Sequence, residues 1–168
     1  MKKVFLLFLL FVSFNSFSQT KVSKSALISL LTEAINKYSE NYEYAYEKLG
    51  SIKANMSADE DGISYYVEGK NIAGHDYQYA GTIKWDQVCA ASRTWYPGES
   101  RSTANRIKIK LKSPFKATLF DAEQTDLEIS DIYMKIKDLG GSNSETMCIA
   151  LAEACNQLGK YNYCNTDR

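Results

Sequence analysis

The hydrophobic period of this chain changes twice, and these two changes constrain its fold more than any other feature. In Lys24–Leu49 apolar residues recur at alternating steps of four and three, the spacing of one face of an α-helix. After Gly50 the period is two, which is typical of strands with one buried face. Helical spacing returns at Ser142 and continues to Gly159. We therefore predict a helix, then an antiparallel sheet, then a second helix.

The first helix is expected to be long. At about 1.5 Å per residue it would extend about 39 Å, with Gly50 in the C-terminal cap position. Its tyrosines recur at steps of four, and this spacing indicates side chains that face the core more than a row of ligand-binding residues. The predicted apolar stripe comprises Leu31, Ile35, Tyr38, Tyr42, Ala45 and Leu49, and Tyr46 completes the tyrosine series. For the second helix, Ser142 and Glu145 have capping-box spacing and Gly159 is the expected stop.

Two segments alternate clearly enough to predict half-buried strands, Tyr77–Trp85 and Arg106–Lys112. Weaker strand patterns cover Ser51–Met56, Ile63–Gly69, Phe115–Phe120 and Asp126–Lys137. The last of these changes phase near Ser130 and Asp131, which predicts a bulge or bend there. Lys112–Pro114 and the longer stretch Ser92–Asn105 are predicted to be a turn and a loop.

The first eighteen residues have the features of a secretory signal. Lys2 and Lys3 precede an apolar run from Val4 to Val12. The small residues Ser16 and Ser18 follow, and we expect cleavage after Ser18. The run is too short for a permanent membrane span, so we expect a soluble periplasmic or secreted protein. Removing the signal leaves eighteen basic against twenty acidic residues, a balance that gives no general attraction to nucleic acid. Residues 19–168 are then expected to form one α+β domain.

The four cysteines are predicted to form disulfides, because the chain is expected to enter an oxidising compartment. Cys148 and Cys155 lie on one helical face about 10.5 Å apart, beyond the roughly 7 Å that a disulfide spans. Two full pairings remain. Either Cys89 bonds Cys148 while Cys155 bonds Cys164, or Cys89 bonds Cys155 while Cys148 bonds Cys164. The first is preferred because Gly159 would let the chain return, and unpaired buried thiols are the alternative. No ligand pair has the spacing of a zinc site.

The strongest candidate for a ligand surface is the loop after Ser92, where Trp95 and Tyr96 stand beside a Pro-Gly turn. The segment Arg93–Lys116 has seven basic residues against one acidic, and Asp121–Asp131 has five acidic residues and no basic one. The alternatives are that Trp95 plugs one end of the sheet, and that the lysines pair with the acidic segment. The candidate ligand-binding residues are Arg93, Trp95, Tyr96, Arg101, Lys108 and Lys110.

Three segments carry a resemblance to known proteins: Phe17–Gln19, Ile83–Val88 and Ala150–Cys155. They resemble segments of small exported, uncharacterised proteins of Bacteroidota bacteria. The order of several strands followed by one helix over Ser51–Lys160 is similar to a pleckstrin-homology-like barrel, which implies that the helix plugs one barrel end. A cystatin-like roll, in which the sheet wraps a long N-terminal helix, is the alternative architecture.

Together these patterns predict a curved antiparallel sheet of five to seven strands between a long N-terminal helix and a C-terminal helix. The predicted function is a non-catalytic exported binding protein for a glycan, lipid or protein, with no metal and no cofactor. The alternative is a small secreted hydrolase or an enzyme inhibitor. The only histidine, His75, is predicted to lie in a turn beside Asp76. His75, Asp76 and Cys89 are the one catalytic set that the sequence offers, and the alternative is that His75 is a solvated residue of the turn.

Overall fold

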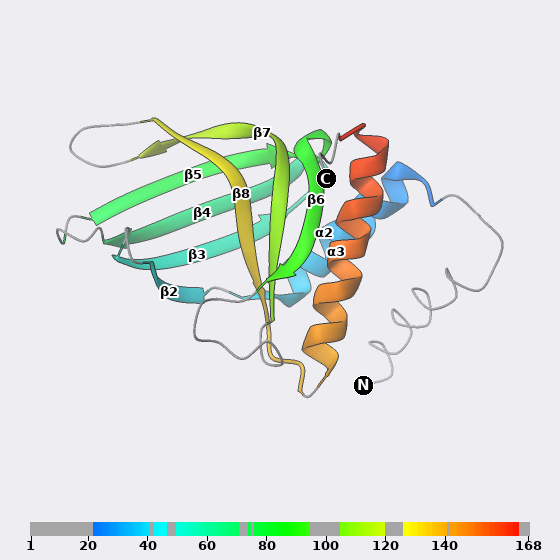
Figure 1. Cartoon of the computed structure of the whole chain (residues 1–168), viewed down its shortest axis with the longest axis horizontal. Helices are drawn as coiled ribbons and strands as arrows, with labels where there is room; N and C mark the ends of the chain where they lie inside the picture. The colour runs from blue at the N-terminus through cyan, green and yellow to red at the C-terminus, as the bar shows by residue number, and fades with distance from the viewer. Residues whose placement is uncertain are drawn as a thin grey trace.

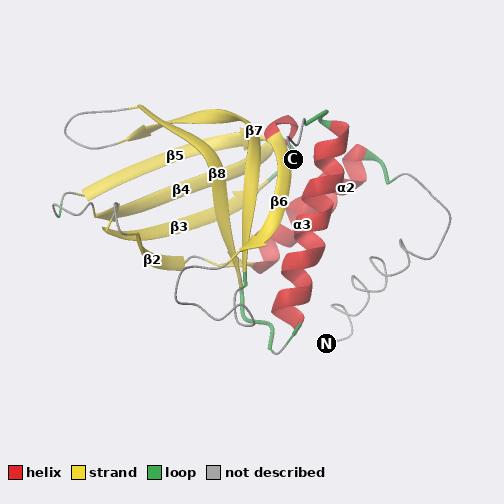
Figure 2. Cartoon of the chain, in the orientation of Figure 1, coloured by secondary structure: helices red, strands yellow, loops and turns green. Residues whose placement is uncertain are grey.

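The computed structural model describes residues 22–40, 42–46, 50–70, 74, 76–94, 105–119, 126–140 and 142–164. The predicted signal, residues 1–18, lies outside this part of the chain. Two helices, α2 (Lys24–Tyr38) and α3 (Asn143–Tyr161), come before and after the strands (Figure 2). The strands are β1 (Ser39–Glu40), β2 (Tyr42–Tyr46), β3 (Gly50–Ala58), β4 (Gly62–Lys70), β5 (Asp76–Lys84), β6 (Val88–Thr94), β7 (Arg106–Leu119) and β8 (Asp126–Ile136), and a 3-10 turn at Trp85–Gln87 follows β5. The predicted α+β class with helices at both ends is confirmed.

The strands form two antiparallel groups, β2-β3-β4-β5 and β6-β7-β8, and the two-residue β1 pairs with β8. Figure 1 shows the second group crossing the first, with α3 lying along β6 and α2 beside α3. Only the pairs Tyr79–Leu119 and Ala80–Thr118 join β5 to the far part of β7. No pairing among the described strands closes the groups into a barrel, so the predicted barrel is wrong. The seven strands of the two groups lie within the predicted five to seven, although β2 and β6 are not among the predicted segments and β1 adds a two-residue strand.

The N-terminal helix is shorter than predicted. It begins after Ser23, whose hydroxyl accepts a hydrogen bond from the Ala26 amide at 3.2 Å, and it ends at Tyr38. The segment Tyr42–Tyr46 is strand β2, paired with β3, so the tyrosine series does not continue along a helix. Its sequence YEYAY also alternates at period two, and tyrosine favours strands. The long helix required by the roll architecture is therefore absent from the described residues.

Strand β7 joins two segments that were predicted to be separated by a turn. Between the paired residues Lys110 and Phe115 the register with β8 shifts, and 111–114 lie opposite the single residue Ser130. Pro114 has no amide hydrogen to donate, and a bulge is where a strand tolerates that loss. The predicted irregularity near Ser130 is thus confirmed, whereas the predicted turn at Lys112–Pro114 is wrong.

Two asparagine side chains cover backbone groups at strand edges. Asn156 of α3 accepts from the Ala91 amide at 2.8 Å and donates to the Ala91 carbonyl at 3.0 Å. Asn36 of α2 makes the same two bonds with Ala58 of β3, at 2.8 and 2.6 Å. Each amide replaces the neighbouring strand at that point, which blocks further strand pairing there.

The second helix does not stop at Gly159 but continues to Tyr161. The N-cap residue Ser142 makes no side-chain capping bond, and Glu145 forms an ion pair with Arg93, so the predicted capping box is wrong. Gly159 is needed for a different reason. A methyl group at this position would overlap the carbonyl oxygen of Cys89 in β6. Helix α3 therefore packs unusually close to β6.

The disulfide joins Cys89 to Cys164, with Cα atoms 5.3 Å apart. The preferred pairing of Cys155 with Cys164 and Cys89 with Cys148 is wrong, because Cys148 and Cys155 are free and buried. The exclusion of a Cys148–Cys155 bond is confirmed. Because α3 continues past Gly159, the chain reverses only after the helix ends, and Cys164 reaches β6 instead of returning to Cys155.

One hydrophobic cluster unites both strand groups and both helices. Its fully buried members include Leu31 and Ile35 of α2, Ile107 and Ile109 of β7, and Leu158 of α3. The two faces of strands β3 to β5 therefore differ, because one packs on this core and the other is exposed. Among the described residues no helix is long and apolar enough to cross a membrane.

Candidate functional site

The predicted ligand-binding residues do not form one surface in the described part of the chain. Arg93 pairs in register with the buried Ile107 and forms an ion pair with Glu145 of α3. It therefore lies on the face of β6-β7-β8 that α3 covers. Trp95, Tyr96 and Arg101 lie outside the described residues, so their role stays a prediction.

Lys108 and Lys110 lie on the opposite face of the same strands from Arg93, because side chains alternate along β7. The Lys108 ammonium is 3.0 Å from the Asp131 carboxylate, and this hydrogen bond raises the pKa of Lys108. Lys110 is exposed. The alternative interpretation, in which lysines pair with the acidic segment, is thus confirmed for Lys108.

The catalytic set of His75, Asp76 and Cys89 has no free thiol, because Cys89 is in the disulfide. His75 lies outside the described residues, and Asp76 forms an exposed ion pair with Lys70 at 3.1 Å. Burial raises the pKa of the Cys148 thiol to about 11 and that of Cys155 to about 12, so both are protonated near neutral pH. The described residues contain no group of three histidine, cysteine or acidic side chains placed to hold a metal ion.

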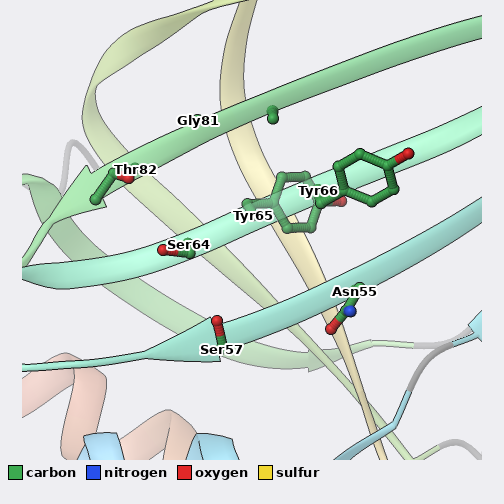
Figure 3. A pocket seen from close by; sticks show the side chains of 8 residues that line it. Asn55, Ser57, Ser64, Tyr65, Tyr66, Gly81 and Thr82 are labelled. Atoms are coloured by element: carbon green, nitrogen blue, oxygen red, sulfur yellow. The ribbon is translucent and has the colours of Figure 1, made fainter.

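An open groove of about 430 Å³ lies on the exposed face of β3, β4 and β5. Figure 3 shows its labelled residues distributed over these three adjacent strands. Such a volume is within the range of about 300–1,000 Å³ that is usual for small-ligand sites. The lining residues are Asn55, Ser57, Ser64, Tyr65, Tyr66, Ala80, Gly81 and Thr82.

The strand register explains the shape of this groove. Paired residues of antiparallel strands point to the same face, so Asn55, Tyr66 and Ala80 form one row across the sheet. A second row beside it is formed by Ser57, Ser64 and Thr82. Tyr66 is the single large side chain among these outward positions, and the small neighbours leave a hollow beside its ring.

Tyr66 is held at the edge of the hollow by its neighbour on β4. Its hydroxyl donates a hydrogen bond of 3.0 Å to the Glu68 carboxylate, and this bond raises the pKa of the tyrosine. The phenol therefore keeps its proton and remains the donor in this hydrogen bond. Because 38% of Tyr66 is exposed, the ring remains accessible to a ligand.

The opposite side of the sheet supports the floor of the groove. Gly81 has no side chain, and a methyl group there would lie 2.9 Å from the Cδ2 atom of Phe115. The Phe115 ring therefore packs directly against the β5 backbone, while Tyr65 points into the core beside Tyr79, with ring centroids 6.2 Å apart. The floor is thus part of the packed core and is preformed.

The sequence pattern alone did not predict this groove. Its residues are small polar side chains on strands, and each resembles an ordinary solvated position. The one available signal was Tyr66, an aromatic residue on the polar phase of Ile63–Gly69. Comparison with protein-family models, with curated proteins and with solved structures finds no match for this chain.

Proposed function

We propose that this chain is an exported, non-catalytic binding protein that holds its ligand in the groove on β3, β4 and β5. The observation that carries the proposal is the groove itself, a preformed hollow on rigid strands with one exposed aromatic ring and neutral hydrogen-bonding side chains. Sites built on strands are positioned more accurately than sites on loops. The arrangement suits recognition of a ligand.

The chemistry of the lining favours binding over hydrolysis. Its serine and threonine hydroxyls would need an adjacent base to become nucleophiles. Among the eight lining residues none is histidine, aspartate, glutamate or lysine. The Tyr66 hydroxyl already donates its hydrogen bond to the Glu68 carboxylate. These groups can orient a ligand by hydrogen bonds and by contact with a flat ring.

The disulfide supports the exported part of the proposal. Bonds between cysteines form and persist in oxidising compartments outside the cytosol. Cys89 and Cys164 are 75 positions apart, so their bond ties β6 to the chain after α3. The predicted surface of Arg93, Lys108 and Lys110 is a weaker candidate for the ligand site, since Arg93 and the lysines project from opposite faces.

The proposal can be tested by NMR titration of the oxidised, ¹⁵N-labelled chain. Three probes are added separately: neutral oligosaccharides, vesicles containing phosphatidylglycerol, and an unstructured peptide, each checked afterwards by mass spectrometry. We expect at least one probe to shift amide signals of β3 to β5 saturably and to be recovered chemically unchanged. Saturable shifts confined to other strands would refute the proposed site. Turnover of a probe that His75→Ala abolishes would instead establish the hydrolase alternative.

A further inference from the structure

The six outward side chains of the groove form a small grid. Neighbouring strands are about 4.8 Å apart, and successive outward residues along a strand are about 6.7 Å apart. The grid therefore measures about 9.6 Å across the three strands and about 6.7 Å along them. One position holds the Tyr66 ring, and the remaining five hold small side chains.

The charge of the grid limits the kind of ligand that it fits. Hydroxyl and amide side chains both donate and accept hydrogen bonds, and no lining residue carries a formal charge. Phosphate and carboxylate ligands are usually bound by arginine or lysine, which the lining lacks. In the next row along the sheet, Lys53 is paired in register with Glu68, so this border is also balanced in charge.

The Tyr66 ring supplies the second element of recognition. An aromatic face is apolar but carries a partial negative charge, so it attracts the weakly positive C–H groups on the face of a saturated ring that lies against it. A pyranose has such a C–H face, and its hydroxyl groups project around the rim. Ser64 lies two residues from Tyr66 on the same strand, and Asn55 lies directly across from Tyr66 on β3. Asn55 is placed to bond a hydroxyl of a sugar that stacks on the ring. Ser64 lies on the side away from Glu68, toward which the Tyr66 hydroxyl points, and is placed to bond the next sugar.

On this basis we propose that the groove binds a neutral oligosaccharide, with one sugar ring stacked on Tyr66 and the next over Ser57, Ser64 and Thr82. The inference rests on the proposed function and names its ligand class. Because the groove is open rather than enclosed, a chain of sugars can extend beyond it at either end. An oligomer would therefore bind more tightly than its monosaccharide.

The test titrates the oxidised chain with neutral tetrasaccharides of glucose, mannose, galactose and N-acetylglucosamine, and with the matching monosaccharides. We expect one tetrasaccharide to shift the amides of β3 to β5 saturably and to bind more tightly than its monosaccharide. Tyr66→Ala should weaken this binding about tenfold or more, whereas Tyr66→Phe, which keeps the ring, should retain it. Tyr163→Ala is the matched control, because it removes an 88% exposed tyrosine outside the groove. Ser64→Tyr should fill the hollow and abolish binding without unfolding a strand, since tyrosine favours strands.

The outcomes separate this inference from the function on which it rests. If no tetrasaccharide produces saturable shifts at millimolar concentration, the sugar inference is refuted. If vesicles or the peptide then shift the same amides, the binding function stands with a different ligand. Equal loss of sugar binding in Tyr66→Ala and Tyr163→Ala would also refute the stacking, and the far-ultraviolet circular dichroism of each variant checks that its fold is retained.

Discussion

The close packing of α3 on β6 can be tested by replacing Gly159 with alanine. This residue lies inside a helix, where alanine is normally the better residue by about 1 kcal/mol. Helix propensity alone therefore predicts that Gly159→Ala stabilises the protein. The packing predicts the opposite.

The magnitude follows from the position of the added methyl group. It would lie 2.8 Å from the carbonyl carbon of Cys89 and would overlap the carbonyl oxygen, whereas carbon atoms in contact are usually about 3.5–4.0 Å apart. The obstacle is backbone, so no side-chain rotation relieves it. Cys89 is further held by the disulfide to Cys164, whose amide donates to the Gly159 carbonyl at 3.3 Å. An overpacking cost of about 3 kcal/mol, reduced by the gain of about 1 kcal/mol in propensity, leaves a net loss of about 2 kcal/mol.

Urea unfolding monitored by circular dichroism and tryptophan fluorescence measures this loss. The buried Trp85 reports on the core next to β6. Lys160→Ala, at the exposed neighbouring position, is the control and should change the free energy of unfolding by less than about 0.5 kcal/mol. If Gly159→Ala raised the unfolding midpoint, helix propensity would outweigh the overlap, and the proposed close approach of α3 to β6 would be refuted.

Three further changes probe the same helix and its disulfide. Asn156→Leu removes both partners of the Ala91 backbone and should lower the free energy of unfolding by about 2–4 kcal/mol. Gln157→Leu should have little effect, and equal losses in urea unfolding would contradict a role for the edge contact. Cys164→Ser opens a loop of 75 positions and should lower the free energy of unfolding by about 4 kcal/mol. An unchanged urea midpoint would refute the stabilising role of the disulfide. Because burial raises the pKa of Cys148 to about 11 and of Cys155 to about 12, the folded chain retains protons that the unfolded chain loses above about pH 8.5. Stability should therefore fall as pH rises from about 9 to 11, and a Cys148→Ser, Cys155→Ala variant measured over the same range should show a shallower fall.

The fold class was predictable because periods of two and of 3.6 differ clearly over long segments. The helix boundary was not, because steps of four satisfy both periods. Tyr38, Tyr42 and Tyr46 fit a helical stripe, yet Tyr42, Tyr44 and Tyr46 fit a strand equally well. Pairing with β3 decides between them, and that pairing depends on tertiary contacts that a local pattern does not contain.

The disulfide shows a different limit of sequence reasoning. Helical spacing correctly excludes a bond between Cys148 and Cys155, but the two remaining pairings hold only if all four cysteines are oxidised. If all four cysteines pair, Cys89–Cys164 occurs only together with Cys148–Cys155, so excluding the second bond also excludes the first. Cys89–Cys164 is nevertheless the bond that forms, because Cys148 and Cys155 are free. The decisive residue is Gly159, whose place near the end of the helical pattern predicts a helix stop although it is a site of close packing on Cys89. A glycine near a helix end has the same local sequence in both roles.

The candidate groove depends on register in a way that no single strand reveals. Asn55, Tyr66 and Ala80 become neighbours only because β3 and β5 both pair with β4 at one particular offset. A shift of one residue would turn these side chains into the core and expose Met56, Tyr65 and Tyr79 instead. The buried face therefore fixes the register, and the register in turn assembles the exposed row beside Tyr66. For this reason the polar residues of the groove are positioned by the apolar residues between them, and a variant that loosens the core at Phe115 would also disturb the groove floor at Gly81.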